Sequence, residues 1–198
     1  MWLAIIGGVG TCKMAVANNL SSEGDFTHHI TNVKKGRDVF EDQFQYLLAR
    51  YKDCNAIKKC GSNQDLLTVR SFWDTHKVFT EFYKQRHMIN NRQYVLLTQL
   101  YEAMADEVSP PQGFIYLKTK MIPAHSRVSL TGGDRRSDEE IKMISDLYEQ
   151  YVLSIRVPVI EVDASRPFDQ VIDEITFGLD SIKTSFSFDQ SVWQRRLF

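Results

Sequence analysis

The chain has 198 residues, a length typical of one α/β domain, and 43% of them are hydrophobic, which is enough for a full core. Its 24 basic and 25 acidic residues nearly cancel, so the overall charge predicts no nucleic-acid or membrane partner. The longest apolar run, 2–6, is far shorter than the roughly 20 residues that cross a bilayer, and no basic signal-peptide segment precedes it. Cys12, Cys54 and Cys60 follow no metal-binding spacing, which indicates free thiols in a reducing compartment, the cytoplasm.

Apolar patterns predict strands and helices that alternate along the chain. Short apolar runs bounded by glycine, proline or polar residues are typical of buried strands, and apolar residues three and four apart are typical of helices. In chain order the patterns predict a strand at 2–6, helices at 13–20 and 38–51, a strand at 66–69, helices at 73–83 and 93–104, a strand at 114–119, a helix at 138–153, a strand at 157–162 and a helix at 168–179. This alternation predicts a parallel sheet covered on both faces by helices, in a single domain over residues 1–198.

A glycine-rich segment, 7–14, joins the first predicted strand to the first predicted helix. In the phosphate-binding pattern G-x-x-x-x-G-K-[ST], backbone N–H groups surround a phosphate, the lysine neutralises charge and the hydroxyl holds Mg²⁺. Gly7 and Lys13 keep this spacing, whereas Cys12 replaces the second glycine and Met14 replaces the hydroxyl residue. A Cβ at Cys12 requires either a strained positive φ or a different loop path, and a thioether does not bind a hard cation. An ordinary glycine turn explains the loop equally well, so other motifs must decide.

Further motifs follow the loop in a consistent order. They are Phe44-Gln45-Tyr46 on a predicted helix, Val69-Arg70-Ser71 at a strand end, Ile115-Tyr116-Leu117-Lys118-Thr119 on a later strand, and a basic segment with Arg127, Arg135 and Arg136. In this order, over residues 2–180, the chain resembles the deoxynucleoside kinase family. The resemblance implies a P-loop three-layer α/β/α fold with a parallel sheet of about five strands, and a homodimer. It also implies ATP-dependent phosphorylation of a deoxynucleoside 5′-hydroxyl.

The resemblance assigns the candidate site residues. Lys13, Arg70 and Arg127 become catalytic cations, since arginine forks match phosphate oxygens. Phe44, Gln45 and Arg70 become substrate-binding residues, with Gln45 reading the nucleobase. The candidate ATP-binding residues are Gly7, Gly8, Val9, Gly10, Thr11, Cys12, Lys13, Met14 and Arg135. Mg²⁺ is implied by the family, but no residue here is assigned as its ligand.

The chain also departs from the family at three oxygen donors. No acid lies in segment 30–33, where the family carries its catalytic carboxylate; Val69 replaces the glutamate of the E-R-S motif, and Met14 replaces the hydroxyl. A missing general base lowers a rate by about 10²–10⁴. Asp38, Glu41 or Asp74 could replace it, although acids at a helix start are more often solvated.

Two functions therefore stay open, an active deoxynucleoside kinase and a catalytically inactive kinase-derived protein that binds nucleotides or serves in assembly. A nucleoside monophosphate kinase is disfavoured because such enzymes keep an intact phosphate loop and lack this order of motifs. In each case the expected ligand is a nucleoside or nucleotide.

Overall fold

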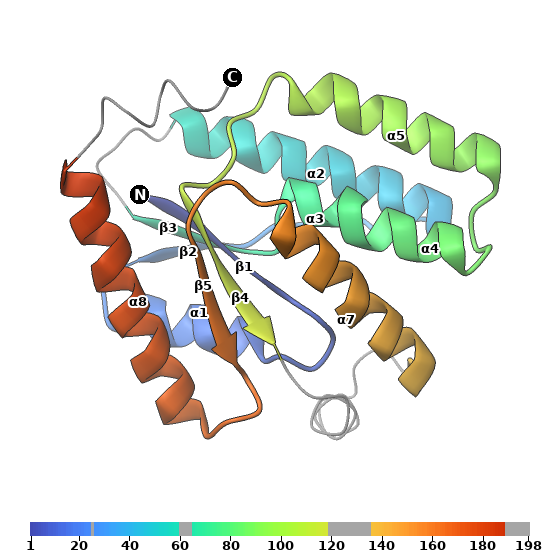
Figure 1. Ribbon diagram of the computed structural model, residues 1–198. Helices are drawn as coiled ribbons and strands as arrows, with labels where there is room; N and C mark the ends of the chain where they lie inside the picture. Colours follow the sequence, from blue (N-terminus) through green and yellow to red (C-terminus); the bar gives the residue numbers. More distant parts are fainter. Residues whose placement is uncertain (25, 60–64, 119–135, 189–198) are drawn as a thin grey trace.

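One parallel sheet forms the centre of the computed structural model, which describes residues 1–24, 26–59, 65–118 and 136–188 (Figure 1). Its five strands lie in the order β2-β3-β1-β4-β5, and each neighbouring pair is parallel. The strands are β1 (Trp2–Gly7), β2 (Thr27–His29), β3 (Leu66–Val69), β4 (Gly113–Lys118) and β5 (Val159–Asp163). The predicted five-stranded parallel sheet is confirmed.

Helices cover both faces of the sheet, which confirms the three-layer fold. The helices α1 and α8 cover one face, and the other described helices cover the opposite face (Figure 1). The helices are α1 (Lys13–Ser22), α2 (Val39–Lys59), α3 (Phe72–Asp74), the π-helix η1 (Thr75–Thr80), α4 (Glu81–Gln85), α5 (Asn91–Ala105), α7 (Asp138–Leu153) and α8 (Phe168–Phe188). Within the described ranges, no helix has the length and apolar character needed to cross a bilayer.

The central strand β1 is buried along its whole length, as its unbroken apolar sequence predicts. Because side chains alternate along a strand, Leu3 and Ile5 pack towards α1 and α8, whereas Ala4 and Ile6 pack towards η1, α4 and α7. Both faces of the sheet therefore hold hydrophobic cores, and β1 is fixed between them. Its carboxyl end, where the glycine loop begins, has a rigid support.

Several boundaries differ from the prediction. The strand β2 was not predicted, because its sequence Thr-His-His is short, polar and at the sheet edge. The helix α2 continues past its predicted end to Lys59, because Cys54 and Ile57 extend the buried stripe that contains Leu47 and Arg50. The helix predicted at 73–83 is one helical region whose middle is a π-helix. Cys12 and Cys54 are free thiols, as predicted, while Cys60 lies outside the described residues.

Candidate active site

The site lies at the carboxyl edge of the sheet, where the strand order changes direction. The strand β1 lies between β3 and β4: the connection after β1 leads to β2 on one side, and the connection after β3 leads to β4 on the other side. In open α/β sheets ligands bind at such a switch point. The glycine loop follows β1, and Arg70 follows the neighbouring strand β3. The fold thus brings the loop and this arginine to one edge.

The loop keeps the backbone path of a strand-to-helix turn at the expense of strain at Cys12. Gly7 has φ 147°, and a Cβ there would lie 2.4 Å from the carbonyl oxygen of Leu117 on β4. Gly10 has φ 74°. Cys12, directly before α1, has φ 55° and ψ 28°, a left-handed conformation that L-residues other than glycine adopt at a cost of about 1–2 kcal/mol. Of the two outcomes expected for Cys12, the strained positive φ is the one observed.

The Cys12→Gly variant is expected to be more stable than the natural protein by about 0.5–1 kcal/mol, because glycine adopts this φ freely. Part of the strain relief is offset by the larger unfolded-state entropy of glycine. Urea unfolding of both proteins measures the difference. The Cys54→Ala variant removes the other described thiol, which is buried in α2, and is expected to be less stable. A loss of stability in Cys12→Gly would contradict the strain argument.

Lys13 is held inside the loop. Its ammonium nitrogen donates hydrogen bonds to the carbonyl oxygens of Gly7 (3.0 Å) and Gly8 (2.5 Å) and to Oγ1 of Thr11 (2.9 Å). Burial, with a further contribution from the charge of Arg70, keeps the pKa of Lys13 well below its usual value. Lys13 and Arg70 are therefore close enough for their charges to interact, which places both residues at one site.

Arg70 is fixed by three side chains, two from the helical region that follows it and one from α7. Its own backbone has φ 68°, a strained conformation that clusters at functional sites. Its Nη1 atom donates to the phenol oxygen of Tyr148 on α7 (2.8 Å) and lies 3.7 Å from Oδ2 of Asp74. Its guanidinium carbon lies 4.1 Å from the ring centre of Phe79. The predicted site arginine is thus positioned by packing and hydrogen bonds.

Asp74 is completely buried, and both its carboxylate oxygens are in use. Oδ1 accepts hydrogen bonds from the backbone N–H (2.5 Å) and the hydroxyl (2.7 Å) of Ser71, and Oδ2 accepts one from Tyr148 (2.6 Å). Asp74 caps its helix and anchors Tyr148. It does not line the cavity described next, so a structural role accounts for it.

Asp38 and Glu41, the other two carboxylates considered from the sequence, lie at the start of α2. Asp38 accepts the N–H of Glu41 (2.9 Å), and Glu41 accepts the Nε–H of Arg37 (2.9 Å). Neither lines the cavity. They are helix-start acids, which is the interpretation that the sequence favoured.

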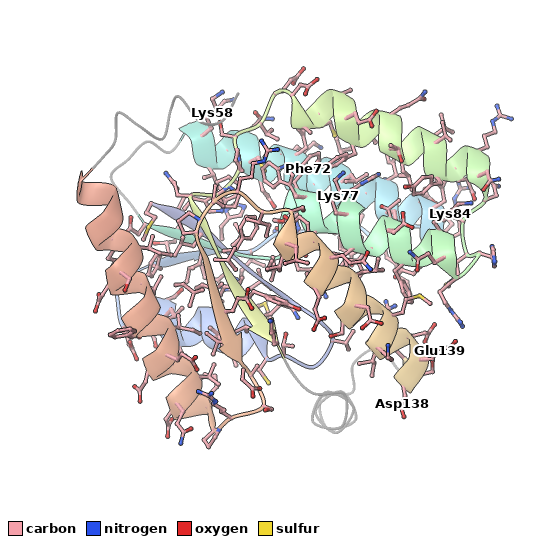
Figure 2. All side chains as sticks on the ribbon, viewed as in Figure 1. Lys58, Phe72, Lys77, Lys84, Asp138 and Glu139 are labelled. Atoms are coloured by element: carbon pink, nitrogen blue, oxygen red, sulfur yellow. The ribbon has the colours of Figure 1, made fainter. Side chains whose placement is uncertain are left out.

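A cavity of about 520 Å³ opens beside Arg70, between α2, η1 and the start of α7. Its volume falls within the range of small-molecule sites. Figure 2 shows the start of α7, marked by Asp138 and Glu139, on the side of the molecule where α4 carries Lys84. The cavity is lined by cations (Lys35, Arg70, Arg136), carboxylates (Asp42, Glu140), neutral polar groups (Gln43, Thr75) and flat or apolar side chains (Val39, Tyr46, Phe79, Tyr83, Met88).

The glutamine in this cavity is Gln43. Gln45 lines a separate hollow, and Phe44 is 39% exposed. Residues two apart on a helix point about 200° away from each other, so the two glutamines cannot share a cavity. Gln43 is 3% exposed and lies on the helix face of Val39 and Tyr46. The structure therefore places predicted Arg70 at the cavity but not predicted Gln45 and Phe44.

Other site residues were also missed or fall outside the described parts. Asp42, unassigned from the sequence, lines the cavity and accepts the N–H of Gly36 through Oδ1 (2.6 Å). Arg136 donates from Nη2 to the Tyr83 phenol oxygen (3.0 Å) and lines the same cavity. The predicted site residues Arg127 and Arg135 lie outside the described residues.

These features define a P-loop α/β kinase fold. A sequence model described as deoxynucleoside kinase matches residues 39–177, and the chain belongs to the deoxynucleoside kinase family. Among solved structures, the deoxyadenosine kinase of M. mycoides with dCMP and dCDP has a TM-score of 0.80 and 20% identity. The same enzyme with dATP has a TM-score of 0.79 and 21% identity. In both comparisons the alignment covers 91% of this chain and 100% of the other. No curated protein sequence matches.

Proposed function

We propose that this protein is an ATP-dependent deoxynucleoside kinase that phosphorylates the 5′-hydroxyl of its substrate. The observation that carries this proposal is that one cavity is lined by a buried amide (Gln43), a carboxylate (Asp42) and a fixed cation (Arg70). Arg70 lies at the sheet edge where the glycine loop also lies. Phosphoryl transfer depends chiefly on positioning and on neutralising charge, and these groups supply both.

Gln43 and the aromatic walls suit a nucleobase. A glutamine amide both donates and accepts, and a base edge needs such a partner when it is removed from water. Oε1 of Gln43 lies 3.4 Å from the Thr80 hydroxyl, which holds the side chain in the buried wall. The rings of Tyr46, Phe79 and Tyr83 line the same cavity and offer flat surfaces for a base.

Arg70 and Lys13 suit the phosphate groups. Among the described residues, only Nη1 of Arg70 has a hydrogen-bond or ion-pair partner, which leaves Nε and Nη2 for ligand oxygens. The loop N–H groups at the start of α1, together with Lys13, form the expected binding place for ATP, which supplies the phosphoryl group. The part of the chain that the structure describes holds no cluster of three acidic, histidine or cysteine side chains for a metal. Met14 cannot act as a Mg²⁺ ligand, so no step is assigned to Mg²⁺.

Asp42 is the proposed general base. Its Oδ1 atom accepts the Gly36 N–H, and Oδ2 has no hydrogen-bond partner among the described residues. The other cavity carboxylate, Glu140, has both oxygens engaged, because Oε2 accepts the Ser137 N–H (3.0 Å) and Oε1 faces Arg86 (3.7 Å). Asp42 is therefore the better acceptor for the proton of the 5′-hydroxyl.

A kinase assay tests the proposal directly: the protein is incubated with labelled ATP, Mg²⁺ and each of the four deoxynucleosides, and phosphorylated product is measured. The natural protein is expected to form a deoxynucleoside monophosphate, and Asp42→Asn is expected to lower kcat by about 10²–10⁴. Asp38→Asn, which changes a carboxylate at the same helix start but outside the cavity, is the matched control. Product no higher than that of a Lys13→Ala variant would show that the protein is not a kinase.

Gln43→Ala is expected to raise KM for the deoxynucleoside at least about tenfold, because a base edge would lose a buried hydrogen bond worth about 1.4 kcal/mol or more. Gln45→Ala is expected to leave KM unchanged, since Gln45 lines a different hollow. Steady-state kinetics with both variants separate the two assignments. If Gln45→Ala alone raised KM, the substrate would bind outside the cavity beside Arg70.

A second candidate function is nucleotide binding without turnover. It is favoured by Met14, which is 47% exposed where the family has a hydroxyl, and by Val69 in place of the glutamate of the E-R-S motif. Thermal unfolding with and without nucleoside tests this function, because a ligand that binds only the folded state raises Tm. Stabilisation without product formation supports it, and measurable turnover excludes it.

We also propose a homodimer formed through α2 and α5. These helices lie side by side and expose Phe44 (39%), Val95 (50%) and Leu96 (48%). Exposed apolar side chains on two neighbouring helices offer surface for a contact with a second copy of the chain. Sedimentation equilibrium is expected to give twice the chain mass, and Leu96→Glu is expected to return the mass to that of one chain.

A further inference from the structure

A second cavity, of about 560 Å³, lies on another face of α2. It is formed by α2 and by the segment 29–34, which follows β2. Its volume is close to that of the candidate active site and within the range of ligand sites. The segment also separates the two cavities, because Lys34 lines the second and its neighbour Lys35 lines the first.

The charges around this cavity favour an anion. Lys34 and Lys52 are both exposed, and neither has an ion-pair partner in the described parts of the chain. The carboxylate in the wall, Asp53, is already engaged: Oδ1 lies 2.9 Å from Nε2 of His29, and Oδ2 accepts the Thr31 hydroxyl (2.5 Å). The cavity is therefore lined by two lysines without an ion pair and by one carboxylate that already has two partners, which leaves a net positive charge.

The remaining wall suits a planar, partly polar group. Ile30, which is 61% exposed, and Leu48 provide apolar surface, and the amides of Asn32 and Gln45 can donate and accept hydrogen bonds. An apolar surface with a few placed amides binds a base, and the two lysines bind phosphate oxygens. This combination matches the chemistry of a nucleotide better than that of an inorganic anion.

We propose that the cavity between α2 and segment 29–34 is a second nucleotide-binding site, which takes a nucleoside triphosphate through Lys34 and Lys52. This site is separate from the candidate active site and does not depend on its chemistry. The segment is tied to α2 by several contacts, because Thr31 accepts a hydrogen bond from Arg50 and both Thr31 and His29 contact Asp53. Its next residue, Lys35, lines the first cavity.

Counting bound dATP by isothermal titration tests the proposal. The natural protein is expected to bind two dATP molecules per chain, and Lys34→Ala/Lys52→Ala is expected to weaken one site at least tenfold. Lys58→Ala/Lys59→Ala removes two exposed lysines from the same helix outside both cavities, and it is expected to keep two sites. Lys58 lies near the end of α2 that is farther from Lys84 (Figure 2). Deoxyadenosine, which lacks the phosphates, is expected to bind the second site at least tenfold more weakly than dATP.

A Lys13→Ala background separates this proposal from the proposed function. There the loop site is weakened, and the remaining dATP site is expected to respond to Lys34→Ala/Lys52→Ala whether or not the natural protein has kinase activity. Equal binding by Lys34→Ala/Lys52→Ala and Lys58→Ala/Lys59→Ala would overturn the second site. Loss of all dATP binding in Lys13→Ala alone would overturn it as well, because only one site would then exist.

Discussion

Asp74→Ala is expected to destabilise the protein by about 3–5 kcal/mol, because it removes one member of a buried charged network. Ser71 and Tyr148 would lose their acceptor, and the guanidinium of Arg70, 3.7 Å away, would lose its buried counter-charge. Urea unfolding followed by circular dichroism measures the loss. Arg70 would also lose its fixed position, so we expect weaker nucleotide binding at temperatures where the variant is still folded.

The control for this prediction is Asp146→Ala. Asp146 is an exposed acid on α7 whose partner, Lys142, lies 2.8 Å away on the same helix. Exposed pairs of this kind contribute little to stability, so no clear change is expected. If Asp74→Ala were as stable as Asp146→Ala, the network would not hold the fold.

Gly7→Ala is expected to destabilise the protein by about 3 kcal/mol or more and to abolish nucleotide binding by the loop. A methyl group at this position would lie 2.4 Å from a backbone oxygen of β4, which cannot move aside as a side chain can. The φ of 147° adds strain for any residue with a Cβ. The loop would have to leave its position at the end of β1. Urea unfolding and titration with ATP measure the two effects.

Gly8→Ala is the matched control, because no atom other than those of Gly8 and its two chain neighbours lies within 4 Å of the position of its added Cβ. Its stability is expected to change by about 0.5 kcal/mol or less. Equal stability of the two alanine variants would show that Gly7 does not need to be glycine.

The architecture could be predicted because its signals are local. The apolar run of β1, the glycines that follow it, and the helical stripe of α7 each occur within a few residues of sequence. The strand β2 lacked such a signal. It is a strand because its backbone pairs with β3, and three polar residues give no periodicity from which to infer that pairing.

The site was less predictable, because it depends on which face of α2 is turned towards the cavity and on contacts between residues far apart in the sequence. Gln43 and Gln45 are both plausible in the sequence, and only the rotation of α2 decides which one enters the cavity. Asp74 had the residue type of a catalytic acid. Its role is decided by Tyr148, which is 74 positions away in the sequence. Arg70, in contrast, was found because a family motif marks a strand end.

The two edges of the sheet affect how copies of this chain can associate. An edge strand exposes unpaired N–H and C=O groups to which another chain can add. Here β2 has three residues, all polar, and β5 carries Glu161, paired with Lys118, in its middle. Short strands and charged side chains both discourage such addition. The sheet is therefore a poor template for growth into a larger sheet, and association of this protein is left to the surfaces of its helices.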